Sequence, residues 1–161
     1  MTYLEIDQAI IKITRQKCAE CKARLDAIPK ENATERKAIQ LEYGMYTFCG
    51  NAGLLHQGNR EAPLKTRQRF LGNKLHKYPK LNDVYQSLDE EEKLRFLAAL
   101  QAEIFLRDQW LGEQYAELSA AEASGDTEKI FELKIKIGSV ETMFAAWEDW
   151  RVENNVYPKM F

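Results

Sequence analysis

Apolar residues that recur at helical spacing constrain the fold of this chain more than any other feature. The clearest run lies within residues 127–154, where they return at every third or fourth position: Ile130, Leu133, Ile137, Val140, Phe144 and Trp147. Residues three or four apart share one face of an α-helix, so this spacing predicts a long helix with one buried stripe.

A second long run precedes it, over residues 88–123. A leucine or isoleucine recurs here every seven residues from Leu97 to Leu118, and the acidic residues 89–92 suit the positive end of a helix dipole. Ser124-Gly125-Asp126 lies between the two runs. A turn this short predicts that the two helices pack antiparallel as a hairpin.

Residues 2–28 are predicted to form the first helix, which Pro29 ends. Its apolar stripe has the members Leu4, Ile11, Cys18, Cys21, Leu25 and Ile28. Residues 33–48 are predicted to form the second, because Asn32 and Glu35 resemble a capping box. Its expected buried face consists of Ala38, Leu41, Met45 and Phe48, and the glycine-containing run 50–53 is expected to end it.

Residues 64–77 are predicted to form a shorter helix that begins after Pro63 and ends at Tyr78-Pro79. No β-alternation, internal repeat or dividing linker interrupts these patterns. A length of 161 residues is enough for one core and short for two, and 45% apolar content is typical of globular chains. We therefore predict a single all-α domain over residues 1–161, a bundle of four or five helices dominated by the long antiparallel C-terminal hairpin.

The chain shows no pattern of a secreted or membrane protein. The first residues lack a basic region followed by an apolar run, and no apolar stretch approaches the roughly 18–20 residues that cross a bilayer. The three cysteines are too few and odd in number for a disulfide framework. These observations predict a cytoplasmic protein without a membrane segment.

Charge is laid out unevenly along the sequence. Residues 56–80 carry seven Lys/Arg against one acid, a local balance of +6, whereas residues 81–128 carry twelve acids against three bases, a balance of −9. Local potential decides what a surface attracts. The basic segment could contact phosphates. Alternatively, its cations neutralise the acidic helix of the same molecule or of a second copy.

Cys18-x-x-Cys21, with Cys49 and His56, forms a Cys₃His set that zinc could use. However, Cys18 and Cys21 continue the apolar stripe of a helix, and no second CxxC occurs in the sequence. Buried free cysteines are common in cores. We therefore predict core cysteines, with no metal site and no cofactor.

No catalytic motif appears in the sequence, neither a phosphate-binding loop nor a nucleophile elbow nor a metalloprotease helix. Glu103, Asp108, Glu113 and Glu117 are interpreted as solvated charges, with Glu103 and Arg107 forming an i,i+4 pair. Asp108 falls at a seam position, which predicts a polar layer or the edge of the buried face. We predict that the chain is not an enzyme.

The C-terminal residues 156–161 are too apolar to remain solvated. They are expected to fold back and cap the bundle, the alternative being an anchor for a partner.

The sequence thus predicts a non-catalytic cytosolic binding protein, an adaptor, inhibitor or regulatory factor that docks onto a macromolecule, most simply a protein. Eight residues are the expected contacts: Arg60, Lys65, Arg67, Arg69, Lys74, Lys77, Trp150 and Phe161. The alternative is a nucleic-acid-binding regulator that uses residues 56–80. A homodimer is compatible with either.

Overall fold

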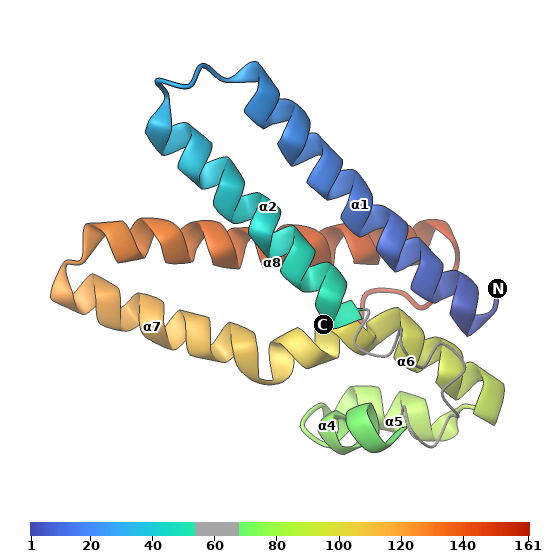
Figure 1. Ribbon diagram of the computed structural model, residues 1–161. Coiled ribbons are helices and arrows are strands. Elements are labelled where there is room, and N and C mark those ends of the chain that lie inside the picture. Colours follow the sequence, from blue (N-terminus) through green and yellow to red (C-terminus); the bar gives the residue numbers. More distant parts are fainter. Residues whose placement is uncertain (54–67) are drawn as a thin grey trace.

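The computed structural model describes residues 1–53 and 68–161, and within those ranges the chain is helical and contains no strand (Figure 1). This confirms the predicted all-α fold class. The elements in chain order are α1 (Tyr3–Ala27), α2 (Ala33–Gly53), the π-helical turn η2 (Gln68–Gly72), α4 (Asn73–Leu75), α5 (Pro79–Ser87), α6 (Glu90–Phe105), the π-helical turn η3 (Leu106–Trp110), α7 (Leu111–Ser124) and α8 (Thr127–Glu153).

Local capping signals set several of these boundaries. Thr2 and Glu5 form a capping box at the start of α1, and the Asp89 side chain accepts a hydrogen bond from the Glu92 backbone N–H at the start of α6. Asp126 caps α8 in the same way. Gly125, with φ of +70°, ends α7 in the left-handed conformation that glycine adopts without strain.

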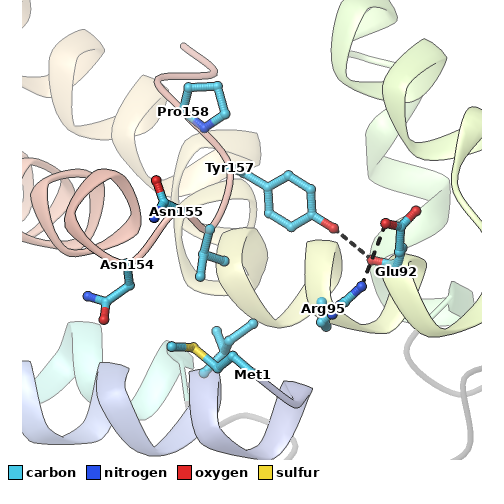
Figure 2. A pocket seen from close by; sticks show the side chains of 9 residues that line it. Met1, Glu92, Arg95, Asn154, Asn155, Tyr157 and Pro158 are labelled. Atoms are coloured by element: carbon cyan, nitrogen blue, oxygen red, sulfur yellow. Dashed lines mark hydrogen bonds and ion pairs between the residues drawn. The ribbon is translucent and has the colours of Figure 1, made fainter.

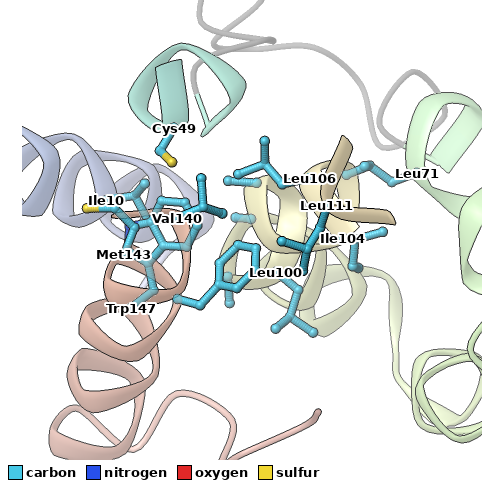
Figure 3. Close-up of a cluster of buried hydrophobic side chains, with 14 of the residues drawn as sticks. Ile10, Cys49, Leu71, Leu100, Ile104, Leu106, Leu111, Val140, Met143 and Trp147 are labelled. Carbon is cyan, nitrogen blue, oxygen red and sulfur yellow. The ribbon is translucent and has the colours of Figure 1, made fainter. Parts of the chain in front are cut away.

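The helices form two packed pairs around a central one. α1 lies beside α2, α7 lies beside α8, and α2 crosses α8 (Figure 1). α6 contacts both α1 and α2, and every residue from Phe96 to Ile104 is buried. A helix that is buried on all sides marks the centre of a core. Figure 3 shows buried side chains from different elements meeting there, among them Ile10, Cys49, Ile104, Leu106 and Met143.

Two predicted boundaries were wrong. The second helix continues to Gly53 instead of ending at residue 48. Gly50 lies inside the helix and allows α1 to pack closely, since a Cβ there would lie 2.5 Å from Cγ2 of Thr14. The described part of the predicted helix 64–77 ends at Leu75, and Pro79 begins a further helix, α5, that the sequence pattern did not predict. Proline both stops one helix and suits the first turn of the next.

The predicted single helix over 88–123 is divided by η3, where the Leu111 N–H donates to the carbonyl of Leu106, five residues back. It also begins later than predicted, since residue 88 lies between α5 and α6.

The buried faces of the first two helices also differ from the predicted stripes. Leu4 is 40% exposed and Phe48 is 37% exposed. Of the predicted stripe of α1, Ile11 and Cys21 are buried, and the buried face also includes Ile6 and Ile10, which were not predicted. A strict seven-residue repeat drifts around an ideal helix of 3.6 residues per turn, so a stripe drawn at sevens cannot follow one face of a straight helix.

The C-terminal tail folds back over α6, as the sequence predicted. The Tyr157 hydroxyl donates to the Glu92 carbonyl at 3.0 Å, and its ring packs edge-on against Phe96, with centroids 5.3 Å apart. Phe161 packs edge-on against Tyr78. Within the described residues, no helix combines the length and apolar content that a membrane span requires.

Candidate functional site

The basic segment meets the acidic stretch at Asp108, in the π-helical turn η3. Lys74 Nζ lies 2.7 Å from Asp108 Oδ2 and Lys77 Nζ lies 2.8 Å from Oδ1. The Asp108 side chain is 9% exposed, whereas that of Lys77 is 55% exposed. Lys74 also lies over the Phe105 ring, 4.7 Å from its centroid. Two cations expected to contact a partner are therefore paired within the molecule.

This pairing sets the charge state of the cluster. Burial alone would raise the pKa of the Asp108 carboxyl, but hydrogen bonds from Lys74 and Lys77 outweigh that effect and lower the pKa. The hydrogen bond with Asp108 in turn raises the pKa of Lys77. The lowered pKa of Asp108 and the raised pKa of Lys77 both favour the charged forms of this pair.

A second charged network lies deeper, between α6, η3 and α8. Glu103 accepts a hydrogen bond from Arg107 Nη2 at 3.0 Å and lies 3.2 Å from Arg151 Nη1. The predicted Glu103–Arg107 pair is confirmed, but the interpretation of Glu103 as a solvated charge was wrong: its side chain is 2% exposed, and that of Arg151 is 1% exposed. α6 is buried on every side, so it has no solvated face at this position.

Arg151 is a residue that the sequence analysis missed. It lies four positions after Trp147, so it continues the apolar stripe of α8. A cation on a buried stripe needs a charged partner, because an unpaired buried charge is very costly. That position on the stripe was the signal that could have identified a buried ion pair.

Arg107 connects this network to the C-terminus. Its guanidinium lies 4.4 Å from the centroid of the Phe144 ring and 4.4 Å from that of the Phe161 ring. A guanidinium between two aromatic faces is held by cation–π attraction on both sides. Phe161 is therefore half-buried against the molecule's own core, and Trp150 is packed against the same core.

Of the four other predicted contacts in the basic segment, the structure describes Arg69. Arg60, Lys65, Arg67 and the candidate ligand His56 lie outside the described residues. Arg69 is exposed. Of the described basic residues in the segment, Lys74 and Lys77 converge, and they do so on Asp108.

An aromatic groove of about 220 Å³ adjoins this cluster, between α2 and η3. The Phe48 and Trp110 rings meet in it with centroids 5.5 Å apart, and Lys74, Phe105 and Glu113 line it further. Sequence reasoning assigned Phe48 to the core and did not single out Trp110. We call this feature the Phe48–Trp110 groove.

A second hollow, of about 340 Å³, lies between the start of α1, α6 and the turn after α8 (Figure 2). Arg95 and Glu92 form an ion pair at 3.6 Å on its wall. Asn155 and Tyr157 form the turn, with positive φ values of 56° and 50°. Within the described part of the chain, the ionisable side chains that line this hollow are Glu92, Arg95 and Tyr157.

The cysteines are placed as core residues, in agreement with the sequence-based interpretation. Cys21 and Cys49 are buried, and Cys18 is partly exposed. Burial raises the pKa of the Cys21 thiol to about 11 and that of the Cys49 thiol to about 12. Within residues 1–53 and 68–161, no three His, Cys, Asp or Glu side chains come together as metal ligands.

Comparison with known proteins gives no match: no family model, no curated protein and no solved structure is similar to this chain.

Proposed function

We propose that this chain is a cytoplasmic, non-catalytic binding protein, an adaptor, inhibitor or regulatory factor, that docks onto a protein partner through the Phe48–Trp110 groove. The observation that carries the proposal is the aromatic pair itself. Phe48 is 37% exposed although it lies on a helix that supplies core residues, and it packs against Trp110 at the edge of a groove. Aromatic residues in such settings dominate the binding energy of many interfaces.

Charge favours a partner with basic and apolar side chains. Lys74 and Lys77 are paired with Asp108, which reduces the positive potential beside the groove. α7 leads away from Trp110 and carries three exposed acids, Glu113, Glu117 and Glu122, with no basic residue. Complementary potentials steer partners and select among them. A partner that inserts an apolar side chain and flanks it with lysine or arginine fits this surface.

The same observations weigh against nucleic acid as the target of this surface. A phosphate backbone needs several unpaired cations in a continuous track. Around the groove the described cations are paired, and the neighbouring α7 surface is acidic.

The test is affinity capture with the full chain, comparing Phe48→Ala with Tyr43→Ala. Tyr43 is a matched control because it lies on the same helix, is 42% exposed and does not line the groove. We expect a partner that resists nuclease treatment, is retained by Tyr43→Ala and binds Phe48→Ala about tenfold or more weakly. Circular dichroism of both variants checks that helix content is unchanged.

Two results would contradict the proposal. Equal retention of the partner by Phe48→Ala and by the wild type would remove the groove from the interface. Loss of the captured material on nuclease treatment would favour the nucleic-acid alternative.

A further inference from the structure

The two ends of the Phe48–Trp110 groove carry opposite charges. α4 packs against α6, ahead of the π-helical turn η3, and brings Lys74 to the groove, with Lys77 on the same carboxylate of Asp108. α7 continues from η3 in the other direction and brings Glu113 to the groove (Figure 1). Trp110 lies between these charges, as the last residue of η3. The groove is therefore basic at one end, aromatic in the middle and acidic at the other end.

These charges lie at similar distances on either side of the aromatic pair. Lys74 and Lys77 meet Asp108, two residues before Trp110, and Glu113 comes three residues after it. At a rise of about 1.5 Å per helical residue, both positions lie within roughly 5 Å of Trp110 along the helix axis. Half a turn about an axis through Trp110, perpendicular to the helix, thus exchanges the basic end with the acidic end. A surface of this kind is complementary to a second copy of itself.

The charged groups keep the capacity to bind a second molecule. Lys77 is 55% exposed, and its ammonium group has three N–H donors, of which the contact with Asp108 at 2.8 Å uses one. Glu113 is exposed and accepts a hydrogen bond from Gln109 Nε2 at Oε1, at 2.7 Å, so its second carboxylate oxygen can accept another. The chain as a whole carries a formal charge of −2, so two copies repel each other only weakly.

We propose that the occupant of the Phe48–Trp110 groove is a second copy of this chain, bound as an isologous dimer. This inference rests on the proposed function, because it names the partner of the same groove. Glu113 of each copy contacts Lys77 of the other, and the Phe48 rings of the two copies pack together between these pairs. The second copy supplies what the surface selects, an apolar side chain flanked by lysine, and the two-fold axis closes the assembly at two copies.

Light scattering on the full chain over a range of concentrations measures the dissociation constant of the dimer. We expect a dimer for the wild type and for Tyr43→Ala, since Tyr43 is an exposed aromatic residue of the same helix that does not line the groove. Phe48→Ala should raise the dissociation constant about tenfold or more. Glu113→Lys and Lys77→Glu should each weaken the dimer too, because each variant sets like charges against one another twice across the axis.

A mixture of the two charge variants is the decisive measurement. When Glu113→Lys associates with Lys77→Glu, the new lysine of one faces the new glutamate of the other, and the second contact keeps its original pair. The mixture should therefore associate more strongly than either variant alone, which contact with an unrelated partner would not produce. Circular dichroism checks that both variants are folded. If the new carboxylate beside Asp108 unfolds Lys77→Glu, the comparison of Phe48→Ala with Tyr43→Ala still decides the proposal.

A wild type that stays monomeric up to about 1 mM, where only very weak association is missed, overturns the proposal. The proposed function then still holds if affinity capture retains another protein through Phe48, and it fails on a different result, equal capture by Phe48→Ala and the wild type. A dimer that Phe48→Ala does not weaken overturns the proposal, because the groove is then not its interface. Two folded charge variants that associate no better in mixture than alone overturn it as well.

Discussion

Substituting Glu103 by glutamine should destabilise the protein more than any surface change. Arg151 is 1% exposed, and Glu103 is the carboxylate that it contacts, at 3.2 Å. Its Nη1 also donates to the Ala99 carbonyl at 3.4 Å, but its Nε makes no hydrogen bond within the described residues. Glu103→Gln therefore leaves a buried guanidinium without a compensating charge, whereas Arg107, at 28% exposed, can still be solvated.

Removing one partner of a buried ion pair typically costs about 3–5 kcal/mol, so we expect Glu103→Gln to lose about that much free energy of unfolding. For a chain of this length, that loss lowers the melting temperature by on the order of 10 °C. Urea unfolding followed by circular dichroism measures the effect, with the m-value checking that the transition stays two-state. Glu20→Gln is the control: Glu20 is 49% exposed and pairs with Lys17, and such exposed pairs are worth about 0–1 kcal/mol.

A double substitution isolates the pair from the packing around it. Glu103→Leu with Arg151→Met replaces both charges by apolar groups, and such replacements are often neutral or stabilising. We expect the double variant to be more stable than Glu103→Gln alone. The reasoning is refuted if Glu103→Gln loses less than about 1 kcal/mol, the range of an exposed pair, or if the double variant is the less stable of the two.

Three further predictions follow from other parts of the structure. Folding lowers the pKa of Asp108, so its ion pairs stabilise the protein above the unfolded pKa of about 3.9, and this stability is lost as the pH falls through the pKa of the folded state. In Asp108→Asn, the free energy of unfolding should therefore fall less steeply with decreasing pH, which urea unfolding below about pH 4 would measure. Gly112→Ala should stabilise α7 by about 0.5–1 kcal/mol, since a Cβ there meets nothing within 4 Å. Gly125→Ala should destabilise the protein by about 1 kcal/mol, because Gly125 has a φ of +70°. Equal effects of the two substitutions in thermal unfolding would contradict this. Maleimide at neutral pH should modify Cys18 well before the two buried cysteines, and mass spectrometry of the peptides would show a different order if the packing of α1 on α2 were wrong.

Sequence reasoning succeeded where the signal is local. The first helix was predicted over 2–28 and runs from Tyr3 to Ala27; the last was predicted over 127–154 and runs from Thr127 to Glu153. Capping side chains and Pro29 or Gly125 act within a few residues of the boundary, so they can be recognised without knowing the rest of the fold. Trp147 on the last stripe is 2% exposed, as its spacing predicts.

Sequence reasoning failed where the burial of a side chain depends on which other helix packs against it. Phe48 has the spacing of a core residue, yet its ring is partly exposed beside Trp110. Glu103 is of a residue type that is usually exposed, yet its side chain is buried because other helices surround this part of α6. The π-helical turn η3 adds a residue to one turn and shifts the phase of everything after it, so a face extrapolated through this turn is misplaced.

The pairing of the basic segment with the acidic stretch changes how the charge layout should be interpreted. The sequence balance of +6 beside −9 suggests two strong opposite patches, but Glu103 and Asp108 are neutralised by cations from α8, η3 and the basic segment. On α7, Glu117 lies 3.9 Å from Lys129 of α8, whereas Glu113, which borders the Phe48–Trp110 groove, and Glu122 have no basic residue within their own helix. Electrostatic steering of a partner acts over about a Debye length, roughly 10 Å at 0.1 M salt. The apolar contacts in the groove form only once the two proteins touch. A charge reversal at Glu113 should therefore slow association with the partner, whereas removal of the Phe48 ring should speed dissociation. Measuring both rate constants for the two variants would separate the electrostatic from the apolar part of recognition.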